Sequence, residues 1–78
     1  MNVTEYLGKE YNSAQILYKN LSTIKTLSPN ERKNTLKLIE AQLEIIDSLD
    51  EECGLPQDER RLAFIVRTLV AARRLCLE

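Results

Sequence analysis

The chain has no histidine and no tryptophan, and only two cysteines, two glycines and two prolines among its 78 residues. Structural zinc sites usually need four Cys or His ligands at short paired spacings, whereas Cys53 and Cys76 lie 23 residues apart, so a zinc site is excluded. The acidic run from Asp47 to Glu52 lacks the alternating oxygen ligands and glycine turn of a calcium loop. We therefore expect neither a metal nor a cofactor.

Sequence signals for catalysis, export and membrane insertion are also missing. No Gly-rich phosphate loop occurs, and no Ser or Cys nucleophile has an evident base beside it, so we expect no enzyme. The first five residues, Met-Asn-Val-Thr-Glu, have neither a basic start nor an apolar stretch, so we expect no signal peptide. Arginines interrupt the most apolar stretch, 62–77, so no membrane span is expected. Two cysteines without an export signal favour a cytoplasmic location.

Helical periodicity dominates the rest of the sequence. Apolar residues recur at steps of three, four and seven over three segments, about 3–27, 29–52 and 57–77, separated near Pro29, Gly54 and Pro56. Ser28-Pro29-Asn30-Glu31 combines an N-cap serine, a first-position proline and a glutamate at the third position. We predict a single domain, 1–78, of all-α class: an antiparallel three-helix bundle.

The second predicted helix has a wide apolar face. One stripe comprises Leu36, Ile39, Leu43 and Ile46, and a second comprises Leu38, Ile45 and Leu49. At about 100° per residue, the two stripes together span about half of the helix circumference. A helix with so wide an apolar face contacts more than one neighbour, so we predict that it is the middle helix of the bundle.

Charge is segregated along the chain. Residues 38–59 carry eight acids and no base, and residues 60–77 carry five arginines and no acid. Glu40, Glu44, Asp47 and Glu51 follow one ridge of the second helix, and Arg60, Arg67 and Arg74 follow one ridge of the third. In an antiparallel hairpin turning near residues 55–56, Asp47 would face Arg67 and Glu40 would face Arg74. Because exposed ion pairs contribute only about 0–1 kcal/mol each, we expect this ladder to set register rather than stability.

The arginines leave a second interpretation open. Arg61 and Arg73 lie outside the ladder and could contact a polyanion. However, the net charge is −1, and recognition of nucleic acid needs a basic face. The charge balance therefore disfavours a nucleic-acid partner.

More apolar residues are present than three helices need for one core. The surplus that we assign to a protein interface comprises Leu38, Ile45, Leu49, Phe64, Ala71 and Leu75. Large exposed apolar patches usually mark association, so we predict a C2 homodimer in which the same patch meets itself. Some of these residues could instead cover the first helix, and apolar residues that stand singly on a monomer are normal.

Together these features predict a small cytoplasmic helical module that acts by binding another protein, as an adaptor, regulator or inhibitor. The alternative is a nucleic-acid-associated regulator that uses the arginines of the third helix. Salt dependence separates the two, because binding to nucleic acid weakens steeply with salt.

Overall fold

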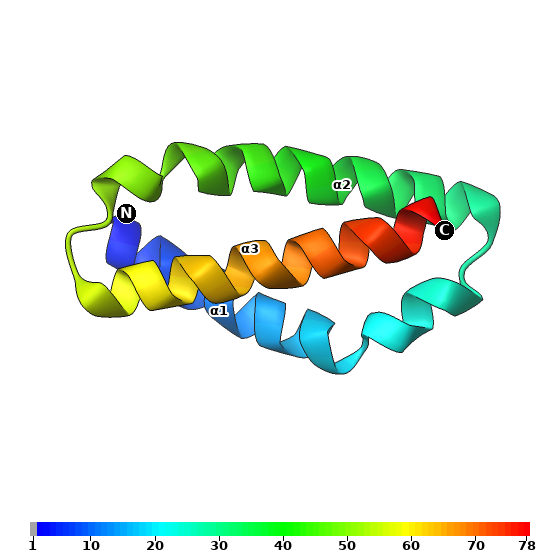
Figure 1. The fold of residues 1–78 in the computed structure, drawn as a ribbon, viewed down its shortest axis with the longest axis horizontal. Helices are drawn as coiled ribbons and strands as arrows, with labels where there is room; N and C mark the ends of the chain where they lie inside the picture. Colours follow the sequence, from blue (N-terminus) through cyan, green and yellow to red (C-terminus); the bar gives the residue numbers. More distant parts are fainter. Residues whose placement is uncertain (1) are drawn as a thin grey trace.

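The computed structural model describes residues 2–78, and every regular element in that range is helical. The elements are α1 (Val3–Lys19), the 3-10 segment η1 (Leu21–Thr26), α2 (Pro29–Ser48), the 3-10 segment η2 (Asp50–Glu52) and α3 (Pro56–Leu77). They form a loose, elongated bundle of 39 × 21 × 19 Å (Figure 1). The all-helical prediction is therefore confirmed.

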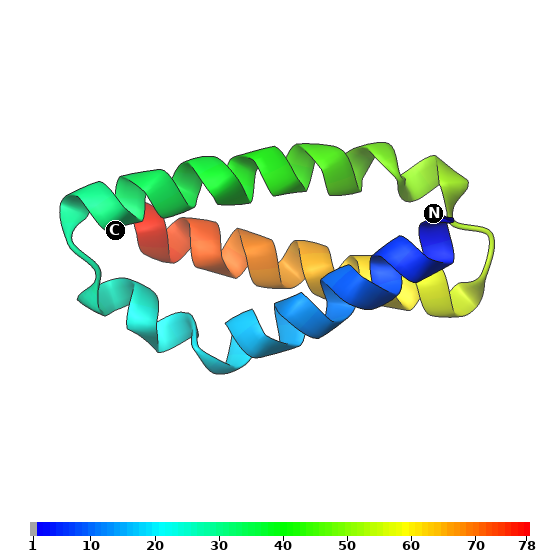
Figure 2. The ribbon, with the colours of Figure 1, turned by 180° about the vertical axis from the view of Figure 1, so that it is seen from behind.

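The central element is α3, not the second helix that its wide apolar face led us to expect. α3 packs against α1 and η1 along one side and against α2 along another. Figures 1 and 2 show α2 running antiparallel to α3, while α1 begins at the same end of the bundle as α3. A direct link between α1 and α2 is the hydrogen bond that Gln42 Nε2 donates to Tyr6 Oη, at 3.0 Å. The wide apolar face of α2 therefore remains partly uncovered.

The predicted helix starts match the structure closely. Asn2 caps α1 by accepting a hydrogen bond from the Glu5 backbone N–H, at 2.8 Å. Ser28 caps α2 with both reciprocal bonds of a capping box: Glu31 N–H donates to Ser28 Oγ, and Ser28 N–H donates to Glu31 Oε1. Each cap satisfies backbone donors that have no partner inside the helix.

The helix ends come earlier than predicted, and side chains account for both differences. α1 ends at Lys19 rather than near Leu27. Just after this end, Asn20 Nδ2 donates a hydrogen bond to the Ile16 carbonyl. In η1, the Thr23 and Thr26 hydroxyls each donate to the carbonyl three residues earlier. α2 ends at Ser48, whose Oγ donates to the Ile45 carbonyl at 2.6 Å. Such side-chain bonds compete with the α-helical backbone pattern. Three acids also follow Ser48, where the helix dipole disfavours negative charge.

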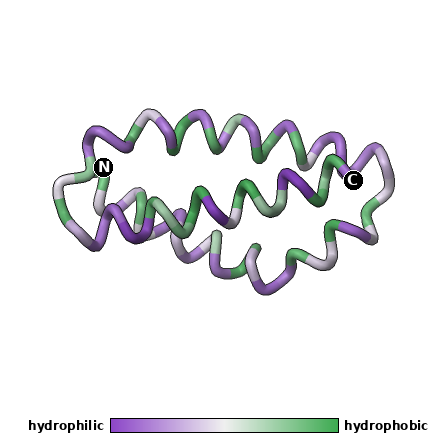
Figure 3. Tube along the Cα trace, viewed as in Figure 1, coloured by the Kyte–Doolittle hydropathy of each residue, from purple (hydrophilic) through white to green (hydrophobic). Residues whose placement is uncertain are grey.

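The core is a single cluster to which α3 contributes most. Its buried residues are Leu7, Ala14, Ile24, Ile39, Ile46, Leu62, Ile65, Leu69 and Ala72. Apolar and hydrophilic positions alternate around every helix (Figure 3), and the main apolar stripe of each predicted helix supplies these core residues. Because α3 is buried along two sides, only its outward face is open to a partner.

Candidate binding face on α3

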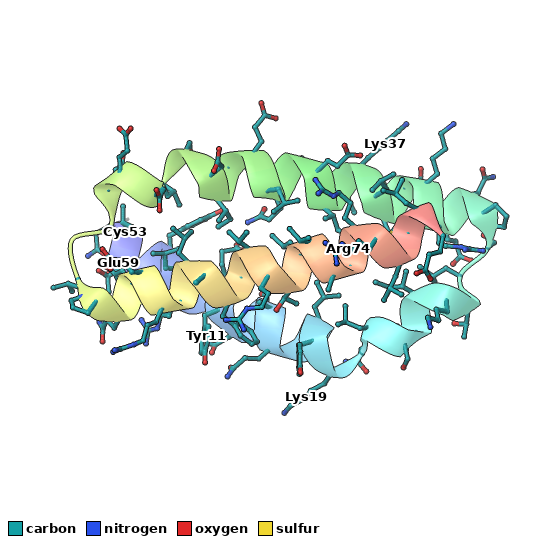
Figure 4. All side chains as sticks on the ribbon, viewed as in Figure 1. Tyr11, Lys19, Lys37, Cys53, Glu59 and Arg74 are labelled. Carbon is teal, nitrogen blue, oxygen red and sulfur yellow. The ribbon has the colours of Figure 1, made fainter. Side chains whose placement is uncertain are left out.

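A groove of about 900 Å³ follows the outward face of α3. Its apolar floor is formed by Leu62, Ala63, Val66, Val70 and Ala71. Arg67 and Arg74, both exposed, also line it, and Asp50 and Glu59 line it as well. Figure 4 shows Glu59 near the start of α3 and Arg74 toward its other end. The groove therefore combines a small-residue floor with positive and negative groups.

The spacing along α3 explains this arrangement. Ala63, Val66 and Val70 recur at steps of three and four, so they share one face of the helix. Arg67 and Arg74 are seven residues apart, which places their Cα atoms about 10 Å apart along the helix axis. Alanine and valine side chains are short, so a partner backbone can approach between the two arginines.

A second hollow, of about 560 Å³, lies where α3 crosses α1. The residues that line it are Tyr11, Gln57, Arg60, Arg61, Ala63, Phe64 and Arg67. The Tyr11 and Phe64 rings meet edge-on with centroids 5.2 Å apart, and the Arg61 guanidinium carbon lies 5.9 Å from the centroid of the Tyr11 ring. Arg67 lines both hollows, so they form one continuous surface along α3.

The six predicted interface residues do not form one face. Leu38 and Ile45 are exposed on α2, at 73% and 48%. Leu49 is half-buried and, together with Ile45, lines a shallow hollow with Val3 and Tyr6 of α1. α1 and the core thus occupy part of the surface that we assigned to a second subunit.

Of the three α3 members of the predicted interface, the structure brings two together: Phe64 and Ala71 line one small hollow with Tyr18 of α1. Phe64 packs against both Tyr11 and Tyr18 of α1, with centroids 5.2 and 5.8 Å away. Leu75 is half-buried against the core, and Ala71 lines the groove. Because α3 is central, α1 covers Phe64 within the same chain, whereas Ala71 stays at the groove.

The two arginines predicted to contact a polyanion are not brought together either. Both are half-buried. Arg61 packs on Tyr11, whereas Arg73 lines neither hollow. Twelve residues separate them, which corresponds to about 120° around the helix. The structure instead gathers Arg61 with Arg60 and Arg67. Sequence periodicity pointed to the pair Arg60 and Arg67 but not to Tyr11, which comes from α1.

The acidic ridge is exposed at all four of its positions: Glu40, Glu44 and Asp47 on α2, and Glu51 on η2. None of the side-chain hydrogen bonds within residues 2–78 joins these acids to an arginine of α3. The predicted intrachain ladder is therefore not formed by hydrogen bonds, and both ridges face solvent.

A buried carboxylate joins α1 and α3 at the end where both helices begin. Asp58 is 2% exposed, and its Oδ2 accepts a hydrogen bond from Thr4 Oγ1 at 2.9 Å. Its Oδ1 is buried and has no hydrogen-bond partner among the described residues. A carboxylate near two helix N-termini is favourably placed with respect to both helix dipoles. We assign Asp58 to this junction between the helices.

Both cysteines are reduced and half-buried. Burial raises the pKa of the Cys53 thiol above its ordinary value, and the nearby carboxylates, led by Asp58, raise it further. Burial also raises the pKa of the Cys76 thiol, partly opposed by Arg32. Raised pKa values leave little thiolate, the nucleophilic form of cysteine, at neutral pH.

Within residues 2–78, no three His, Cys, Asp or Glu side chains are arranged to hold a metal ion. No helix in this range is long and apolar enough to cross a membrane. Comparison of the chain with models of protein families, with curated proteins and with solved structures finds no match. Inferences about function therefore depend on the α3 face itself.

Proposed function

We propose that this protein is a cytoplasmic, non-catalytic helical module that acts by binding protein through the groove on α3. The observation that carries the proposal is the groove itself, which has a small apolar floor and includes the exposed Arg67 and Arg74. Helical partners commonly place an apolar stripe in such a groove and align charged side chains along its edges. An adaptor, regulator or inhibitor would need this kind of surface and no reactive group.

The partner that best fits the groove is a second copy of the chain. The acidic ridge of α2 has the charge that Arg67 and Arg74 require, and both ridges are exposed. A two-fold axis parallel to α2 and α3 would place α3 of each copy over α2 of the other. Rotation about this axis does not move a residue along the length of the bundle. In the register predicted from the sequence, Asp47 and Arg67 share one level within a chain, so Arg67 would face Asp47 of the second copy. The acid–arginine pairing that the sequence predicts within one chain would thus form between two chains.

Self-association can be tested by measuring solution mass with size-exclusion chromatography and light scattering. The proposal predicts a dimer at both low and high salt, because the apolar floor supplies most of the free energy. Val70→Asp should convert the protein to a monomer, since it places a carboxylate on that floor.

The matched control is Leu38→Asp, which puts the same charge on an exposed apolar residue of α2. This variant should remain dimeric. A dimer that survives Val70→Asp but not Leu38→Asp would assign the interface to the exposed face of α2 and contradict the groove. A wild-type monomer at all concentrations would contradict the homodimer.

A second candidate function is regulation in association with nucleic acid, and the gathering of Arg60, Arg61 and Arg67 favours it. It predicts binding to an oligonucleotide with a steep loss of affinity as salt rises. Fluorescence anisotropy with a labelled oligonucleotide at two salt concentrations tests this directly. Binding that is insensitive to salt, or no binding, would contradict it.

A further inference from the structure

We propose that the hollow at the crossing of α1 and α3 is a binding site for a phosphate monoester. Its chemistry differs from that of the groove used in the proposed function. Three guanidinium groups, from Arg60, Arg61 and Arg67, line about 560 Å³, and no acidic side chain lines it. The acids nearest in sequence, Asp58 and Glu59, are placed elsewhere: Asp58 is buried, and Glu59 lines the groove.

The positions of the arginines follow from the helix geometry. Arg60 and Arg67 are seven residues apart and share one exposed ridge of α3. Arg61 points across to α1, where its guanidinium lies over the Tyr11 ring. Gly8 of α1 lies beside the Arg61 guanidinium, since a Cβ atom built at Gly8 would lie 3.8 Å from Arg61 Nη1. The arginine ridge and the positioned Arg61 therefore approach the hollow from two sides.

The electrostatics of the hollow favour an anion. Arginine stays charged at all relevant pH values, so the three side chains repel one another. None of them donates a side-chain hydrogen bond to a carboxylate within residues 2–78. A bound anion would replace this repulsion with attraction, and the partly buried ring faces of Tyr11 and Phe64 limit screening by water on one side.

The donors present suit an oxyanion, and the count of three positive groups favours a doubly charged one such as phosphate. Each guanidinium offers a planar fork of N–H groups that matches two phosphate oxygens, and the Gln57 amide can add another donor. A phosphate monoester carries close to two negative charges at pH 7, which suits three positive groups. The hollow is also larger than a phosphate ion, so the group that carries the phosphate can lie against Phe64.

The test is an NMR titration of the full chain with inorganic phosphate, adenosine monophosphate and a phosphoserine peptide, each at constant ionic strength. We expect saturable shifts in the side-chain Nε signals of Arg60, Arg61 and Arg67. Arg60→Gln should weaken binding about tenfold, as expected for the loss of one charged hydrogen-bonding group. Tighter binding of the nucleotide than of the peptide would assign the phosphate to a small molecule, and the reverse would assign it to a modified protein.

The matched control is Arg74→Gln, which removes an exposed arginine from the same helix outside this hollow. It should leave phosphate binding unchanged, and Arg60→Lys should bind with intermediate affinity because it keeps charge but loses the fork. Shifts that rise linearly with any salt, an equal loss in Arg74→Gln, or binding of oligonucleotides alone would overturn the site. Failure of the groove proposal is distinguishable, since Asp47→Arg, which should disrupt the proposed dimer, changes no residue of this hollow and should still bind phosphate.

Discussion

Replacing Gly8 with alanine should stabilise the protein, although Gly8 lies beside a positioned arginine. Glycine in a helix interior is about 1 kcal/mol less favourable than alanine, and Gly8 lies within α1. Its backbone does not have a positive φ, so alanine can adopt the same conformation. The added Cβ would meet Arg61 Nη1 at 3.8 Å, which is ordinary van der Waals contact.

The expected gain is therefore the full propensity difference, about 1 kcal/mol, with no steric penalty to subtract. For a domain of this size it corresponds to a rise in Tm of about 4–8 °C. Urea unfolding followed by circular dichroism measures the change in free energy directly, and an unchanged m-value would show that the unfolded state is unaffected.

The matched control is Gly54→Ala, in the connection between η2 and α3, where a Cβ would meet nothing within 4 Å. It should stabilise the protein less, by about 0.5 kcal/mol, through the unfolded chain alone. If Gly8→Ala were destabilising, Arg61 would need the space over Gly8, and the described packing of α1 on α3 would be wrong.

Three further predictions concern the helix junctions and the thiols. Thr4→Val should destabilise the fold by about 2 kcal/mol in urea unfolding, because it leaves both oxygens of the buried Asp58 without a partner. Ser28→Ala should cost about 1 kcal/mol in the same assay, because it removes the side-chain cap of α2. Burial raises the folded-state pKa of the Cys53 and Cys76 thiols above the ordinary value, so both thiols should react with a disulfide reagent at pH 8 more slowly than in the urea-unfolded chain. For the same reason the free energy of unfolding should fall as pH rises through the ordinary thiol pKa of about 8.5, where the thiols of the unfolded chain ionise first.

The sequence predicts local features of this fold well because they depend on neighbours along the chain. The caps at Asn2 and Ser28 need only the side chains of the first turn, and the core stripes need only helical periodicity. The early ends of α1 and α2 were missed because Asn20, Thr23 and Ser48 do not interrupt the apolar periodicity, although their side chains bond to nearby carbonyls.

The arrangement of the helices is less predictable, because it depends on which apolar faces meet. The second helix has a wide apolar face and the third lies in the most apolar stretch, 62–77, so periodicity alone does not show which one is central. Which helix is central decides where the arginine-lined hollow forms. With α3 in the centre, α1 packs over Phe64 and places Tyr11 beside the arginines. The Arg60–Arg67 spacing was visible in the sequence, but the partner ring from α1 was not.

The most direct test of the proposed function uses two charge-reversed variants, Arg67→Glu and Asp47→Arg, measured by light scattering alone and as an equal mixture. Each variant alone should be monomeric at low salt, where the like charges that face each other across the two-fold axis are screened least. The mixture should form a dimer, since each reversed charge then meets its opposite in the other copy. If the mixture stays monomeric while the wild type is a dimer, the α3 groove does not receive α2 of a second copy.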